Sequence, residues 1–253
     1  MTDEPRIGAG RRTVRILIAV LAVLVLLVVV FLVWASTVFQ GEREASLVAW
    51  EDPAISIKET GNSWVMSPTE DASGDGLVFI PGARVTPSAY FAKLSGLVAE
   101  TGATVVITKP TLNLAFFDTR PLSAFTDGVE GVDDWYVGGH SLGGVKACML
   151  AADPGTDPEP AGLVLFGSYC ASDLSGGDLP VLSLSGSEDG LSTPTKIEGA
   201  AHLLPASAEF VEIEGASHAS FGDYGPQPGD GTATATDDEV REAITAAWAE
   251  FTE

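Results

Sequence analysis

The chain has 253 residues and a formal net charge of −22, with 35 acidic residues against 13 basic ones and two cysteines. A surface this acidic repels nucleic acid and anionic lipid headgroups, so the composition argues against both as partners. The negative charge is explained as a solvated surface that keeps the domain soluble. The chain is long enough for a domain that buries one sizeable core.

Residues 16–39, near the N-terminus, form an uncharged apolar segment that contains the run ILIAVLAVLVLLVVVFLVW. A helix rises ~1.5 Å per residue, so this segment would cross the ~30 Å hydrocarbon core of a bilayer. A cleaved signal peptide is the alternative, but its apolar region is usually about 7–15 residues long. The following ASTVFQGERE also offers no convincing small-residue cleavage site. We therefore expect an uncleaved transmembrane helix that contacts the lipid bilayer.

Basic residues cluster on one side of this segment. Four arginines precede it, Arg6, Arg11, Arg12 and Arg15, whereas the GERE that follows is mixed in sign. Flanks rich in arginine and lysine remain in the cytoplasm. We therefore expect a single-pass protein of the cell membrane, with residues 1–15 as a cytoplasmic tail, 40–53 as a linker and 54–253 as an extracytoplasmic domain.

Short apolar runs alternate with helical patterns through the rest of the chain. A hairpin is predicted over 54–68. Further strands are predicted over 76–82, 104–110, 135–141, 162–168, 179–186 and 208–215, and helices over 88–102, 142–153, 195–204 and 239–251. Near-continuous apolar strands that alternate with helices predict an α/β domain, in which a mostly parallel central sheet has helices on both faces. Functional residues of such sheets collect at the carboxyl ends of the strands.

Residues 139–143 read GHSLG, which is the only G-x-S-x-G match in the chain. The match lies where a predicted strand gives way to a predicted helix. Glycines two residues before and after the serine permit a sharp strand-to-helix turn that exposes the serine hydroxyl. The hydroxyl would then lie at the positive end of the helix. Ser141 is therefore the predicted nucleophile.

A serine nucleophile needs a base, and the chain has three histidines. His140 lies inside the turn and His202 on a predicted helix face, and both are interpreted as structural residues. His218 follows the last predicted strand, at the carboxyl end of the sheet, and is the predicted base. Asp189 follows the strand before it and is the predicted acid that orients the histidine. Its neighbour Glu188 is interpreted as a solvated side chain.

The order Ser141, Asp189, His218 along the chain resembles that of the α/β-hydrolases. Over roughly residues 54–253 the chain looks like a compact, dienelactone-hydrolase-like member without a large lid domain. The resemblance implies a serine hydrolase that cleaves a small-molecule carboxylic ester or thioester through an acyl-enzyme. It implies no cofactor.

The stretch FIPGARV, residues 79–85, resembles the family's loop that supplies part of the oxyanion hole. Such a hole needs two backbone N–H groups aimed at the developing negative charge. By position we expect them from Ala83 and from Leu142, which follows the nucleophile. The chain departs from the family in this loop, because Pro81-Gly82 stands where many members have His-Gly.

Several side chains after strand ends are candidates for the substrate pocket. They are Arg84, Asn113, Phe116, Phe117, Phe221 and Tyr224. A surface charge explains Arg84 equally well, and aromatic residues at strand ends more often belong to the core.

Cys148 and Cys170 leave two interpretations open, a disulfide in an oxidising compartment or two buried free thiols. We expect no metal site, because the sequence has no His/Cys cluster and its aspartates lack the spacing of a calcium loop.

Two other functions use the same sequence features. A lipid-directed acyltransferase would use the same three residues with a different acceptor. A cell-surface binding scaffold would retain them without catalysis, because fold does not imply function.

Overall fold

The computed structural model describes residues 8–253 and divides into two units, Met1–Thr37 and Val38–Glu253. The first unit is the helix α1, Gly8–Ser36, which is long and apolar enough to cross a membrane; a signal sequence would pass the same test. The expected apolar segment of 16–39 therefore ends as a helix at Ser36. Arg6 and the first seven positions of the expected tail lie outside the described residues.

The expected linker, residues 40–53, is instead a packed part of the second unit. It contains the helix α2, Arg43–Glu51, in which Ala49 is fully buried. Trp50 packs edge-on against Trp64, with the ring centroids 5.9 Å apart. Phe39 also belongs to this unit, where it pairs with Val85. Ala49 and Trp50 contact segments that are distant in sequence, so the short segment by itself did not indicate a helix.

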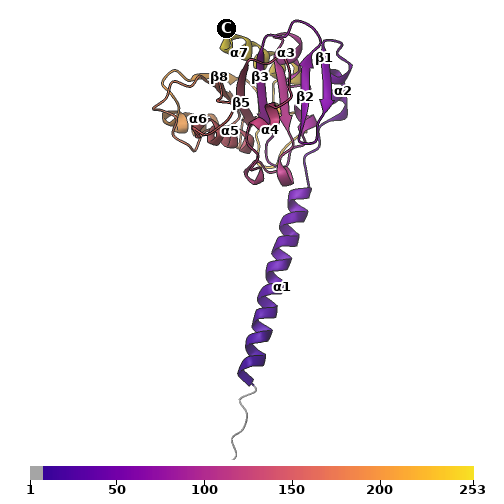
Figure 1. The fold of residues 1–253 in the computed structure, drawn as a ribbon, viewed down its shortest axis with the longest axis vertical. Coiled ribbons are helices and arrows are strands. Elements are labelled where there is room, and N and C mark those ends of the chain that lie inside the picture. The colour runs from indigo at the N-terminus through magenta and orange to yellow at the C-terminus, as the bar shows by residue number, and fades with distance from the viewer. Residues whose placement is uncertain (1–7) are drawn as a thin grey trace, which may run out of the picture. The chain divides into compact units, whose positions relative to one another are not determined.

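An eight-stranded sheet forms the centre of the second unit. Its strands are β1 (Ile55–Glu59), β2 (Ser63–Pro68), β3 (Asp75–Ile80), β4 (Thr104–Thr108), β5 (Asp134–His140), β6 (Gly162–Phe166), β7 (Val181–Gly186) and β8 (Glu209–Ile213). The spatial order is β1-β2-β4-β3-β5-β6-β7-β8, and Figure 1 labels β1 and β8, the strands at its two ends. The β1–β2 and β2–β4 pairs are antiparallel and the others are parallel. The predicted mostly parallel sheet is therefore confirmed.

Helices cover both faces of this sheet. Since side chains alternate in direction along a strand, one strand can contribute to the core on either face. Leu77 and Phe79 of β3 face the core that contains α3 (Ser95–Ala99) and α7 (Asp237–Phe251). Val78 and Ile80 face the core that contains α4 (Ser123–Thr126) and α5 (Leu142–Ala152). A further helix, α6 (Pro194–Ala200), follows β7 (Figure 1).

The helix predicted over 88–102 is broken in two. A 3₁₀ turn, η1 (Pro87–Tyr90), precedes α3. Tyr90, Phe91 and Leu94 are all buried against the sheet. Burial on several sides of the segment competes with one regular amphipathic helix, so tertiary packing overrides the local pattern.

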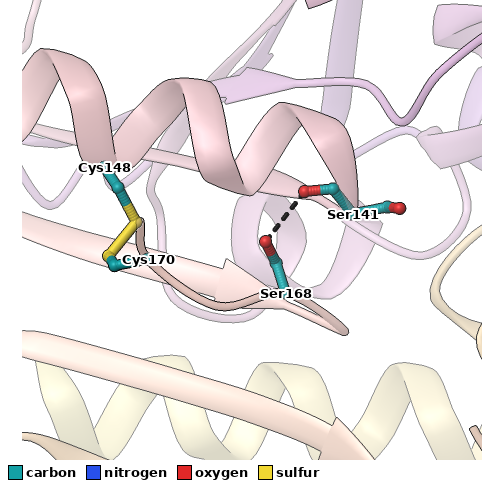
Figure 2. Close-up of a disulfide and its surroundings, with 4 residues drawn as sticks. All are labelled: Ser141, Cys148, Ser168 and Cys170. Atoms are coloured by element: carbon teal, nitrogen blue, oxygen red, sulfur yellow. Dashed lines mark hydrogen bonds between the residues drawn. A yellow bond between two sulfur atoms is a disulfide. The ribbon is translucent and has the colours of Figure 1, made fainter. Parts of the chain in front are cut away.

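Cys148 of α5 and Cys170, which follows β6, form a disulfide with their Cα atoms 5.5 Å apart (Figure 2). The structure thus has the bridge rather than two free thiols. The bridge ties the helix that follows Ser141 to the loop after the neighbouring strand. Its sequence separation of 22 residues corresponds to about 3 kcal/mol of stabilisation in the chain-entropy model.

Candidate active site

Ser141 sits in a strained turn between β5 and α5. Its φ of 52° and ψ of −121° lie outside the regions that non-glycine residues favour. A Cβ atom on Gly139 would lie 2.5 Å from the Ile80 carbonyl oxygen, and one on Gly143 only 1.9 Å from the same oxygen. The turn passes so close to the end of β3 that neither position admits a side chain. This is the geometry that the G-x-S-x-G pattern predicts.

The backbone of Ser141 is hydrogen-bonded to the end of β6 and to the loop that follows it. Its N–H donates to the Phe166 carbonyl at 3.0 Å, and its carbonyl accepts from the Ser168 hydroxyl at 2.8 Å. The Ser141 hydroxyl points away from Ser168 (Figure 2) and makes no side-chain hydrogen bond to another residue among 8–253. The hydroxyl is therefore available for a reaction, while the backbone that carries it is held.

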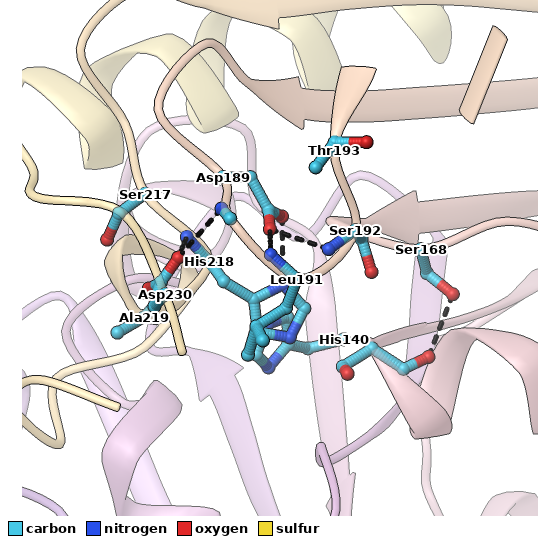
Figure 3. Close-up of polar contacts among 12 residues, drawn as sticks. His140, Ser168, Asp189, Leu191, Ser192, Thr193, Ser217, His218, Ala219 and Asp230 are labelled. Carbon is cyan, nitrogen blue, oxygen red and sulfur yellow. Dashed lines mark hydrogen bonds and ion pairs between the residues drawn. The ribbon is translucent and has the colours of Figure 1, made fainter. Parts of the chain in front are cut away.

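His218 and Asp189 form a buried pair at the carboxyl end of the sheet (Figure 3). His218 Nδ1 lies 2.8 Å from Asp189 Oδ2, and the two side chains are 1% and 0% exposed. Asp189 Oδ1 accepts hydrogen bonds from the N–H groups of Leu191 at 2.8 Å and Ser192 at 2.7 Å. A carboxylate at Nδ1 keeps the proton there and leaves Nε2 free to accept one. Glu188, the neighbouring carboxylate, is exposed.

Within the described residues no hydrogen bond joins Ser141 Oγ to His218. The ring of His140, next to Ser141 in sequence, lies 4.5 Å from the His218 ring between centroids. Hydrogen bonds between nucleophile and base often tighten only when substrate binds.

The loop after β3 leaves one backbone N–H group free. The Gly82 N–H donates to the Tyr90 hydroxyl at 2.9 Å, and the Arg84 N–H donates to the Asn113 carbonyl at 2.7 Å. Between them, the N–H of Ala83 has no partner within residues 8–253. Leu142 is the first residue of α5, and N–H groups in a first helical turn have no partner within their helix. Within residues 8–253, both expected oxyanion donors are therefore without a hydrogen-bond partner.

His140 lies directly behind the His218 ring and is buried. The Tyr90 hydroxyl, which accepts from Gly82, is hydrogen-bonded to His140 Nδ1 at 3.0 Å. Burial, together with the neighbouring His218, lowers the pKa of His140 well below its ordinary value, so that His140 remains neutral. It packs against the His218 ring. Tyr90 carried no signal in the sequence, since only the fold brings it to this loop.

The expected pocket residues divide into two groups. Phe221 and Tyr224 are 0% and 7% exposed and belong to the core, so their assignment to an open pocket is wrong. Their rings pack near the His140 ring, at 6.0 Å for Phe221 and 6.3 Å for Tyr224 between centroids. Burial of their apolar area in the core is favourable compared with exposure to solvent. Arg84 and Asn113 are partly exposed and lie together through their backbone contact. Phe116 and Phe117, beyond Asn113, are about half exposed.

Within residues 8–253, no group of three or more His, Cys, Asp or Glu side chains is arranged to hold a metal ion.

Comparisons with known proteins bear on the family and the fold. A family model described as "Alpha/beta hydrolase family" matches residues 76–242. Among solved structures, Est1E from Butyrivibrio proteoclasticus is similar, with 13% sequence identity and a TM-score of 0.54. The similarity covers 79% of this chain and 99% of that one; at this identity it speaks for the fold alone. No curated protein matches the sequence.

Proposed function

Because the chain belongs to the alpha/beta hydrolase family, we propose that it is a serine hydrolase that cleaves a small-molecule carboxylic ester or thioester. The observation that carries this proposal is the buried His218–Asp189 pair, packed against the residue that precedes the strained Ser141. Ser141, His218 and Asp189 would form a catalytic triad.

In the proposed reaction, Ser141 Oγ attacks the substrate carbonyl while His218 Nε2 takes the hydroxyl proton. The N–H groups of Ala83 and Leu142 donate to the oxyanion of the tetrahedral intermediate. Collapse of the intermediate breaks the bond to the leaving group, which departs as an alcohol or thiol with the proton from His218. Asp189 orients His218 and stabilises its positive charge.

The second half of the reaction hydrolyses the acyl-enzyme. A water molecule attacks the acyl carbonyl while His218 takes one of its protons, and the same two N–H groups stabilise the second oxyanion. The acid product leaves as His218 returns a proton to Ser141. All of these steps use groups of the chain, the substrate and water.

A compact, dienelactone-hydrolase-like architecture is part of this proposal. Residues 167–180, which connect β6 to β7, contain no helix, and this supports the proposal of a member without a large lid domain. Arg84 and Asn113, partly exposed beside Ala83, are the residues proposed to contact the substrate.

Labelling with a fluorophosphonate tests the nucleophile. The folded protein is expected to incorporate one probe molecule, and the label should lie on the tryptic peptide that contains Ser141, as identified by mass spectrometry. Heat-unfolded protein serves as the control, because it keeps Ser141 but loses the base and the oxyanion donors. A folded protein that is labelled no faster than the unfolded control would contradict the proposal.

We further propose that α1 anchors this domain in the cell membrane, with the N-terminus in the cytoplasm. Support comes from the apolar length of α1 and from Arg11, Arg12 and Arg15 at its beginning. The domain that begins at Val38 would then lie outside the cytoplasm, where a disulfide is stable.

Intact cells from which the wall has been removed are the material for a topology test. An external protease is expected to digest the domain, and the uncut protein should remain with the membranes after a high-salt wash. A domain that the protease does not reach would contradict the orientation. A mature protein whose mass lacks residues 1–36 would show instead that the segment is a cleaved signal peptide.

A further inference from the structure

Asp230 lies in the irregular segment between η5 (Ala219–Phe221) and α7, and its carboxylate gathers backbone N–H groups from three stretches of chain. It accepts from His218 at 3.0 Å, Ala219 at 2.8 Å, Gly190 at 3.1 Å and Gly231 at 2.7 Å. Two of these donors belong to the loop of the base, and Gly190 directly follows the acid Asp189. Figure 3 shows Asp230 beside the backbone of His218 and Ala219.

These contacts begin where the hydrogen bonds of the sheet end. Beyond β7 and β8, Ser187 N–H still donates to the Ile213 carbonyl and Glu188 N–H to the Ala216 carbonyl. In the described residues no backbone-to-backbone hydrogen bond joins the two loops further out, at Asp189 and His218. At this point the Asp230 carboxylate connects the two loops, because it accepts from Gly190 N–H on one loop and from His218 N–H on the other.

The charge of Asp230 suits this arrangement. Burial raises the pKa of Asp230, but the four backbone N–H groups outweigh that effect and lower the pKa below its ordinary value. The carboxylate is therefore ionised at neutral pH, and its hydrogen bonds are charge-assisted and stronger than those of a neutral acceptor.

We propose that Asp230 is a positioning residue, which fixes the backbone of His218 relative to that of Asp189 and so holds the imidazole in register with its acid. Asp230 acts through the backbone, because its hydrogen bonds at this site go to N–H groups of the main chain. The inference rests on the proposed function, in which His218 is the base.

The two carboxylate oxygens of Asp230 accept different numbers of hydrogen bonds, so asparagine and alanine at this position should differ in effect. Oδ1 accepts from Gly190, His218 and Gly231, whereas Oδ2 accepts from Ala219 alone. In Asp230→Asn the amide oxygen can keep the three contacts of Oδ1, while the NH₂ group faces the Ala219 N–H. Asp230→Ala removes all four contacts.

Steady-state hydrolysis of a p-nitrophenyl ester tests the proposal, with kcat expressed per active site titrated with fluorophosphonate. We expect kcat to fall about tenfold in Asp230→Asn and about a hundredfold in Asp230→Ala, with KM changed less than about twofold, because misplacement of the base affects the reaction more than binding. The matched control is Asp153→Asn. Asp153 accepts one N–H, that of Gly155, and lies just past the far end of α5 from Ser141, so wild-type kcat is expected.

A readout without catalysis separates this inference from the proposed function. The downfield proton resonance of His218 Nδ1–H, assigned by its loss in Asp189→Asn, should move upfield and exchange faster with water in Asp230→Asn. This result would support the positioning role even if the protein hydrolysed no ester. A wild-type resonance in folded Asp230→Asn, or wild-type kcat per titrated site in that variant, would overturn it. If Asp230→Ala does not fold, the asparagine variant decides.

Discussion

Replacement of Ser141 by alanine is expected to abolish ester hydrolysis, with kcat lower by on the order of 10⁶-fold, and His218→Ala should lose about as much. The two residues act as a unit in the proposed mechanism, because the serine hydroxyl is a weak nucleophile without a base. The double variant is therefore expected to lose little beyond either single change. Initial rates with a short p-nitrophenyl ester measure these losses, and circular dichroism checks that each variant is folded.

Asp189→Asn is expected to lower kcat by about 10⁴-fold, because an amide favours the wrong tautomer of His218. Glu188→Gln is the matched control: it makes the same chemical change one residue away, on an exposed side chain, and should leave kcat near the wild-type value. Chelators should leave the wild-type rate unchanged. Full activity in Ser141→Ala would refute the mechanism, and a severe Glu188→Gln with a mild Asp189→Asn would move the acid by one residue.

Lys93→Met is expected to destabilise the domain by about 3–5 kcal/mol, because it leaves a buried carboxylate without its counter-charge. Lys93 Nζ lies 2.9 Å from Asp223 Oδ1, and both side chains are at most 3% exposed. The same ammonium reaches Asp237 Oδ1 at 2.6 Å, at the beginning of α7. The free energy of unfolding in urea measures the loss. Lys93→Met combined with Asp223→Asn should lose less than Lys93→Met alone, since no unpaired charge remains.

The deficit of Lys93→Met should depend on pH. Burial raises the pKa of Asp223, Lys93 opposes this rise, and Asp237 and Glu42 add to it. Loss of Lys93 therefore raises the pKa further above its unfolded value, and a carboxyl group of this kind costs stability as pH rises through the folded pKa. We expect a smaller deficit at pH 5 than at pH 7.5. Lys109→Met is the control: its partner Glu59 is 58% exposed, so the loss should stay below about 1 kcal/mol. A deficit for Lys93→Met equal to that control would contradict the prediction.

The sheet could be predicted from the sequence because each strand carries its own local pattern. β4, for example, is buried along its whole length and reads as a continuous apolar run. The Ser141 turn could likewise be predicted from local sequence, since the glycines that permit it are two residues away. His218 and Asp189 followed from their places after consecutive strands, as parallel strands bring their carboxyl ends to one edge.

Other parts of the site depend on contacts between distant segments. α2 was missed because its packed residues, Ala49 and Trp50, contact segments that are distant in sequence. Phe221 and Tyr224 were misplaced because an aromatic residue after a strand has the same local pattern whether it faces the core or the solvent. Tyr90 links Gly82 to His140, and Asp230 links the loops of Asp189 and His218; both lie far from these partners in sequence.

The sequence by itself determined the period of each element, the sharp turn at Ser141 and the order of the three catalytic candidates, because these follow from side-chain patterns and backbone sterics within a few residues. Only the tertiary structure decided which polar groups hold those candidates in place. Hydrogen bonds such as those of Asp230 join segments whose separation in sequence carries no pattern, and they form only after the sheet has brought the loops together.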